Sequence, residues 1–167
     1  MGYFGRRQVR VEDDLLVTGR GQYVDDLKLT GMLHVALLRS TMAHARLRAV
    51  DVSRAREATG VVAVFTVEDL PPAARLLPDC HAHPALAPKE LPTLATGKVR
   101  YVGEPIAAVV AESRYLAEDA AELIEVDYDP LPAIIDLEKA MEAGAPLVHD
   151  DRPNNIATRL PINKGDT

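Results

Sequence analysis

One short stretch of the sequence gathers soft metal ligands: Cys80 and His81, followed by His83. A bound metal needs three or four ligands that converge at ~2.0–2.3 Å, and residues this close along the chain cannot easily supply them. Cys80 is the only cysteine, so no second thiolate can complete a site. We therefore predict no metal site, and we interpret the stretch as part of an exposed proline-rich loop. A single cysteine also excludes an intramolecular disulfide and gives no support to secretion.

His44 and Glu104 are the side chains that could take part in acid–base chemistry. A general base needs a reacting partner within reach and usually an orienting carboxylate, and the sequence shows neither for His44. Glu104 lies in Gly103-Glu104-Pro105, where its carboxylate could accept backbone N–H groups of a turn, pair with Arg100 or contact a neighbouring subunit. We predict structural or interface roles for both residues. Gly103 is expected to supply a backbone conformation that a Cβ atom would disfavour.

Two acidic pairs and one glycine pair are weaker candidates for binding sites. Asp13-Asp14 and Asp25-Asp26 lack the spacing of a calcium loop and are typical of solvated turns. Gly19-Arg-Gly21 resembles the start of a dinucleotide-binding motif. No buried strand precedes it, no third glycine falls in the required place and no helix is expected to follow. We therefore predict no phosphate site there, and turns throughout 1–32.

The elements that must position these residues fall into two halves. The pattern of residues 33–66 predicts a strand at 33–38 and a strand at 47–52 whose side chains alternate between its two faces. It also predicts a short helix at 55–58 and a fully buried strand at 61–65. Ser53 is expected to cap the helix, and Gly60 to end it.

The second half, residues 99–143, predicts strands at 99–102, 106–111 and 124–128. Ser113 should cap a helix over 115–123, and Asp136 a helix over 137–143 that Gly144 stops. The first of these helices carries one apolar stripe, made of Leu116, Ala120, Leu123 and Ile124.

Two segments predict no regular element. Residues 70–98 contain six prolines, which exclude a regular helix or a central strand, and a loop of this length is usually functional, ordered by a partner or disordered. Residues 145–167 carry apolar side chains on an extended tail, which must lie on some surface or be exposed at a cost.

Composition excludes several classes of protein. The formal net charge is −6 and no basic run exceeds Arg6-Arg7, which argues against nucleic-acid binding. No apolar run approaches the ~20 residues of a membrane span, and no signal peptide is evident. We predict a cytoplasmic location.

An ordered set of motifs from Gln8 to the end of the chain resembles the large subunit of the xanthine dehydrogenase/aldehyde oxidase family, and in particular its aerobic carbon monoxide dehydrogenase branch. At Thr41-Met42 the sequence departs from the family, which commonly has a proline and then an aromatic residue or histidine. The stretches that carry the resemblance are Arg10-Val-Glu-Asp13, Leu16 to Asp26, Gly31 to His34, Arg39-Ser40, Ala43-His44-Ala45, Gly60 to Val64, Asp69-Leu-Pro71, Val99 to Ala111, Val126 to Pro132, Pro146 to His149 and Asn155-Ile156.

The resemblance implies an α+β fold, the α/β hammerhead, over 1–147 with its proline-rich loop at 70–98. Residues 148–167 would be an extended linker or strap toward a molybdopterin-binding domain or a partner chain. In complete members the hammerhead domain precedes the domains that hold molybdopterin, and it helps to dock them to the iron–sulfur and FAD components. We therefore expect molybdopterin with its molybdenum, [2Fe–2S] clusters and FAD in the full complex, and no cofactor on this chain alone.

These expectations leave no catalytic residue to name. The candidate structural or interface residues are Arg39, His44, Gly103, Glu104 and Pro105. The alternative is a free-standing, non-catalytic binding or assembly module derived from the same domain. We expect the isolated domain to expose an apolar patch where its tail and missing neighbours would lie.

Overall fold

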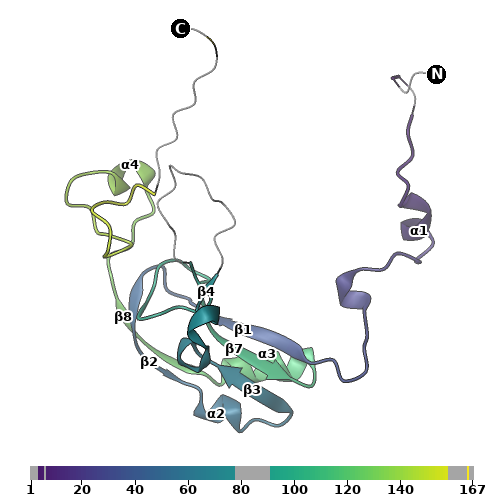
Figure 1. The fold of residues 1–167 in the computed structure, drawn as a ribbon, viewed down its shortest axis with the longest axis horizontal. Helices are drawn as coiled ribbons and strands as arrows, with labels where there is room; N and C mark the ends of the chain where they lie inside the picture. The colour runs from purple at the N-terminus through teal and green to yellow at the C-terminus, as the bar shows by residue number, and fades with distance from the viewer. Residues whose placement is uncertain (1–3, 6, 78–90, 158–164, 166–167) are drawn as a thin grey trace. The chain divides into compact units, whose positions relative to one another are not determined.

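The structure, a computed structural model, describes residues 4–5, 7–77, 91–157 and 165. It divides into two compact units, Met1–Met32 and Leu33–Thr167, which are described separately. The chain contains both helices and strands, and the strands form small sheets, as in an α/β hammerhead (Figure 1). The stretch from Cys80 to His83, which the sequence predicts to be an exposed loop without a metal, lies outside the described residues.

The first unit contains two short helical segments where the sequence predicts only turns. They are α1 (Asp13–Val17) and the 3₁₀ helix η1 (Val24–Asp26). Asp14 pairs with Arg20 at 2.7 Å, and the Asp26 carboxylate accepts a hydrogen bond from the Tyr23 backbone N–H at 2.9 Å. The acidic pairs therefore support local turns and helix starts, where a negative charge near the first N–H groups is favourable.

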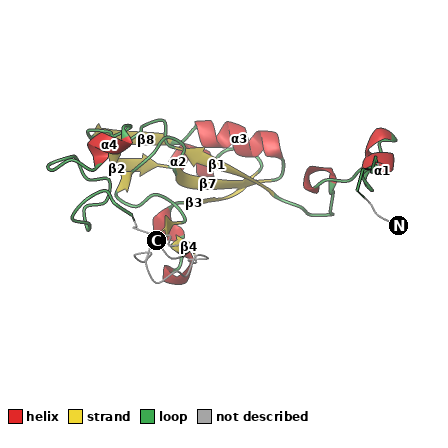
Figure 2. Cartoon of the chain, turned by 90° about the horizontal axis from the view of Figure 1, so that it is seen from above, coloured by secondary structure: helices red, strands yellow, loops and turns green. Residues whose placement is uncertain are grey.

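The first sheet is antiparallel, with the strand order β1–β7–β3. Its strands are β1 (His34–Arg39), β7 (Pro105–Ala111) and β3 (Val61–Phe65). Helix α3 (Arg114–Glu122) lies along one face of this sheet, as Figure 2 shows from above. The predicted apolar run of 106–111 is thus the central strand.

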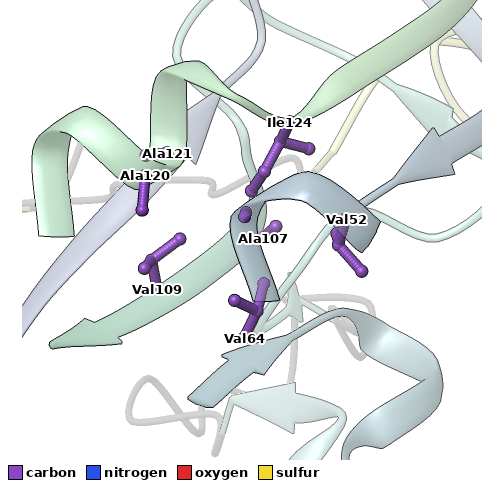
Figure 3. Close-up of a cluster of buried hydrophobic side chains, with 8 residues drawn as sticks. Val52, Val64, Ala107, Val109, Ala120, Ala121 and Ile124 are labelled. Atoms are coloured by element: carbon purple, nitrogen blue, oxygen red, sulfur yellow. The ribbon is translucent and has the colours of Figure 1, made fainter. Parts of the chain in front are cut away.

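The main buried cluster fills the space between this sheet and its helices. Figure 3 shows Ala107 and Val109 of β7 facing Ala120, Ala121 and Ile124 from α3 and the turn after it. Small alanines let the helix approach the sheet closely, which suits a sequence with few aromatic residues. The predicted cap is present, since Ser113 Oγ accepts a hydrogen bond from Leu116 N at 3.3 Å.

The second sheet is also antiparallel, with the order β6–β2–β8. Its strands are β6 (Lys98–Val99), β2 (Ala45–Asp51) and β8 (Glu125–Pro130). A register shift at Arg48 breaks the alternation predicted for 47–52, because the bulge turns both Leu47 and Val50 toward buried clusters.

Shorter elements complete the second unit. They are α2 (Ser53–Arg56), the 3₁₀ helices η2 (Val67–Asp69) and η3 (Pro72–Ala74), the paired strands β4 (Leu76–Leu77) and β5 (Leu91–Pro92), and α4 (Leu137–Ala140). The predicted Asp136 cap is confirmed, with bonds from Glu138 N at 2.9 Å and Lys139 N at 3.2 Å.

Several predicted details of these elements are wrong. Ser53 does not cap α2: the cap position is Val52, and Ser53 instead donates to the Asp51 carboxylate. The strand 61–65 is not fully buried, because β3 is an edge strand in which only Val64 is buried. The strand predicted at 99–102 ends at Val99, where the chain enters a turn. The helix predicted over 137–143 ends at Ala140.

No helix within the described ranges is long and apolar enough to cross a membrane.

Candidate functional site

The predicted site residues Arg39, Gly103, Glu104 and Pro105 come together where β1 ends beside the start of β7. Arg39 Nη1 donates to Gly103 O at 2.9 Å. Two backbone bonds continue the contact, from Ser40 N to Glu104 O at 2.9 Å and from Gly103 N to Ser40 O at 2.8 Å. We call this arrangement of residues 39–40 and 103–105 the polar corner.

A tight turn places Glu104 in the corner. Glu104 N donates to Tyr101 O at 3.2 Å, and Gly103, the third residue of this turn, has a φ of +90°. A positive φ at this position is typical of a type II turn, which strongly favours glycine. The sequence-based expectation for the backbone of Gly103 is therefore confirmed.

Glu104 is a buried carboxylate that contacts two nitrogen atoms of one residue, Arg100. It accepts a hydrogen bond from Arg100 N at Oε2, and its Oε1 lies 3.4 Å from Arg100 Nη1. Arg100 Nη1 also donates to Lys98 O at 3.2 Å. Only 5% of the Glu104 surface is exposed, so the negative charge needs these donors to remain favourable. A carboxylate held in this way fixes the turn and is poorly placed to take a proton from a substrate.

His44 is held away from the polar corner. Its Nδ1 lies 2.8 Å from Pro132 O, and because a carbonyl can only accept, Nδ1 carries the proton. Leu131 N donates to His44 O at 2.9 Å, so both contacts tie the start of β2 to the chain after β8. His44 is buried, and its Nε2 finds no partner within the described residues. Among the residues that the structure describes, no carboxylate is hydrogen-bonded to the ring as it would be in a general base.

A second polar contact ties the tail to the second sheet. Lys98 is buried, and its Nζ lies 2.9 Å from Asp150 Oδ2. The hydrogen bond and the charge of Lys98 hold the pKa of the Asp150 carboxyl below its usual value. Burial lowers the pKa of the neighbouring His149, and the positive charge of Arg100 lowers it further. His149 is therefore favoured in its neutral form.

Asn155 closes the tail into a loop. Its Oδ1 accepts from Val148 N at 3.0 Å, and its Nδ2 donates to Ala140 O at 3.1 Å and Pro146 O at 3.0 Å. A hollow of about 220 Å³ lies within this loop, between 148–149 and 152–157. Another of about 490 Å³ lies between 133–136 and 139–146, and neither hollow is lined by a residue of the polar corner.

Three residues here were missed as site residues: Ser40, Lys98 and Asn155. Ser40 and Asn155 lie in stretches that carry the family resemblance, which was the available signal. Nothing in the sequence marked Lys98 as a site residue, because a lysine beside a proline-rich loop is normally expected at the surface. Its burial depends on an acid more than 50 residues along the chain.

The described residues do not fit a metal or pterin centre. Among them, no three histidine, cysteine, aspartate or glutamate side chains converge as metal ligands. The one buried histidine nitrogen without a partner has less than 1 Å² exposed, so a ligand as large as a pterin cannot reach it in this arrangement.

Comparison with known proteins decides the family. The sequence profile of the aldehyde oxidase and xanthine dehydrogenase a/b hammerhead domain matches residues 18–132. The chain belongs to this family. It is 46% identical to the carbon monoxide dehydrogenase large chain of Afipia carboxidovorans over 147 residues, which are 88% of this chain and 18% of that one. The predicted family and its carbon monoxide dehydrogenase branch are thus confirmed.

Solved structures of the family share this fold. Quinoline 2-oxidoreductase from Pseudomonas putida 86 matches 90% of this chain and 19% of its own, with a TM-score of 0.82 and 42% identity. The Cu,Mo-CO dehydrogenase in its carbon monoxide reduced state matches 96% of this chain and 20% of its own, with a TM-score of 0.78 and 42% identity. The α/β hammerhead fold is therefore confirmed, and the chain spans about a fifth of the length of these relatives.

Proposed function

We propose that this chain is the amino-terminal structural domain of the large subunit of a molybdenum-containing hydroxylase. In that role it docks the molybdopterin-binding domains to iron–sulfur and FAD-binding components in the cytoplasm. Bound molybdopterin would supply the hydroxylation chemistry, and [2Fe–2S] clusters and FAD would carry the electrons away. The observation that carries the proposal is the match of nearly the whole chain to about one fifth of each oxidoreductase relative.

The internal chemistry of the chain supports a scaffold. Three of its buried polar side chains contact other parts of the same chain: Glu104 contacts Arg100, His44 contacts Pro132, and Lys98 contacts Asp150 in the tail. The Glu104–Arg100 pair lies within one turn, the other two contacts join segments far apart in the sequence, and none of the three forms a nucleophile–base pair. The domain boundary at 147/148 is part of the same proposal.

The test is to tag the protein at its own gene and purify it under native conditions. We expect it to carry molybdenum and pterin and to co-purify with iron–sulfur and flavin polypeptides. A native protein with neither the cofactor nor these companions would contradict the proposal and favour the free-standing assembly module.

A further inference from the structure

Two cations lie close together where the second sheet meets the tail. Lys98 and Arg100 are two residues apart, and only 9% and 19% of their side chains are exposed. Each cation has an acid of its own. Lys98 Nζ lies 2.9 Å from Asp150 Oδ2, and Arg100 Nη1 lies 3.4 Å from Glu104 Oε1. Like charges with so little access to water need opposing charges beside them, so both acids matter to this part of the fold.

The two ion pairs are joined through the backbone of Lys98. Arg100 Nη1, which contacts Glu104, also donates to Lys98 O at 3.2 Å. Glu104 Oε2 accepts a hydrogen bond from Arg100 N. Contacts therefore run without a break from Asp150 in the tail to Glu104 in the polar corner. We call Asp150, Lys98, Arg100 and Glu104 the charge chain.

The strand that carries Lys98 is weakly held by its sheet. β6 has two residues, and in the described part of the chain it is paired with one neighbour, β2. Such a short strand makes few ladder hydrogen bonds, so the contacts of its side chains help to fix its backbone. The anchor of the Lys98 side chain is Asp150, and its carbonyl in turn positions Arg100.

The tail presents Asp150 on a loop that has structure of its own. Asn155 closes this loop through the bond from Val148 N to its Oδ1 at 3.0 Å. A loop closed by its own hydrogen bonds moves as a unit. Any movement of the loop away from the second sheet therefore takes Asp150 from Lys98.

We infer that the charge chain couples the tail loop to the turn of the polar corner. While Asp150 holds Lys98, Arg100 stays in place to hold Glu104, and withdrawal of the loop loosens the turn at residues 101–104. The coupling is reciprocal, because a coupling free energy acts equally in both directions. The inference concerns contacts within this chain and does not depend on the proposed function.

The test begins at the exposed end of the charge chain. The Asp150 side chain is 81% exposed, so Asp150→Asn removes its charge without disturbing the core. Asp151→Asn is the matched control, because it makes the same change at the next residue of the loop, outside the charge chain. Hydrogen exchange at Arg100 N, the donor to Glu104, is measured in the natively purified protein at constant pH. Mass spectrometry with fragmentation to single residues resolves this amide.

We expect Asp150→Asn to speed exchange at Arg100 N by at least about threefold. Asp151→Asn should match the parent, and Val109 N in the central strand β7 should not change in either variant. An unchanged rate at Arg100 N in Asp150→Asn would overturn the inference. An equal rise in Asp151→Asn or at Val109 N would also overturn it, because the effect would then not run along the charge chain.

Lys98→Met separates coupling from simple covering of Arg100 by the tail. Methionine has a similar length, and its apolar chain tolerates a buried position. In the Lys98→Met protein, Asp150→Asn should have no further effect on exchange at Arg100 N, because the residue that passes on the effect has lost its charge. A further rise would overturn the inference and indicate that the tail only shields the amide from water.

The reverse direction is tested from the polar corner. Glu104→Gln keeps the shape of the side chain and removes its charge. We expect it to speed exchange at Val148 N in the tail loop, relative to Val109 N in the same protein. A tail loop that exchanges as in the parent would show that the two ends are independent, and would overturn the inference.

Discussion

Among single residues, Glu104 is expected to contribute strongly to stability, because it is buried and paired with Arg100. Removing one partner of a buried ion pair leaves the other charge buried without compensation, so Glu104→Ala should lower the free energy of unfolding by about 3–5 kcal/mol. Glu118→Ala is the matched control, because Glu118 forms an exposed pair with Arg114 at 2.9 Å. An exposed pair of this kind is worth about 0.3–0.5 kcal/mol. Thermal and urea unfolding of the two variants measures the difference, and equal losses would contradict the structural role of Glu104.

His149 should make stability depend on pH. Its pKa in the folded chain is lowered from about 6.5, first by burial and then by the charge of Arg100, so the unfolded chain binds more protons in this range. The contribution is therefore fully present above pH 6.5 and is lost as the pH falls through the lowered folded-state pKa. Urea unfolding between pH 8 and pH 5 should show this loss in the parent protein, and His149→Gln should flatten it. Superimposable pH profiles of the parent and the variant would contradict the account.

The sequence predicted these contacts in part. Pairing with Arg100 was one of three alternatives left open for Glu104, beside backbone N–H groups of the turn and a neighbouring subunit. The special backbone conformation of Gly103 was predicted, because turn chemistry is short-range. The burial of Lys98 could not be predicted, because its partner Asp150 is distant along the chain. Long-range pairing of this kind depends on how the elements assemble.

At the scale of elements, the tail loop depends on Asn155. Asn155→Ala removes three hydrogen bonds, each worth about 1 kcal/mol, and should loosen residues 146–156. Asn155→Asp keeps the acceptor for Val148 N but loses both amide donors, so its effect should be intermediate. Amide hydrogen exchange of this segment at constant pH measures both variants. An unchanged exchange rate in Asn155→Ala would contradict the structure of the loop.

The elements themselves were predicted where local signals suffice. The caps at Ser113 and Asp136 were correct, because a capping side chain acts on N–H groups within three residues. The position of β3 at a sheet edge and the bulge at Arg48 were not predicted. Both depend on neighbouring strands. In the sequence, an apolar run looks the same whether it forms a central strand or an edge strand that has a partner.

For the whole molecule, fold and family were predicted from an ordered set of short motifs and were confirmed. The predicted exposed apolar patch stays a prediction.

The central claim is that the chemistry of this protein is carried by polypeptide outside this chain. The most direct measurement is the pterin content of the purified chain, by fluorescence after oxidation, beside that of the complete large subunit. A cooperative unfolding transition would first establish that the chain is folded. We expect about one pterin for each complete subunit and none on the folded chain. Stoichiometric pterin on the folded chain would contradict the account.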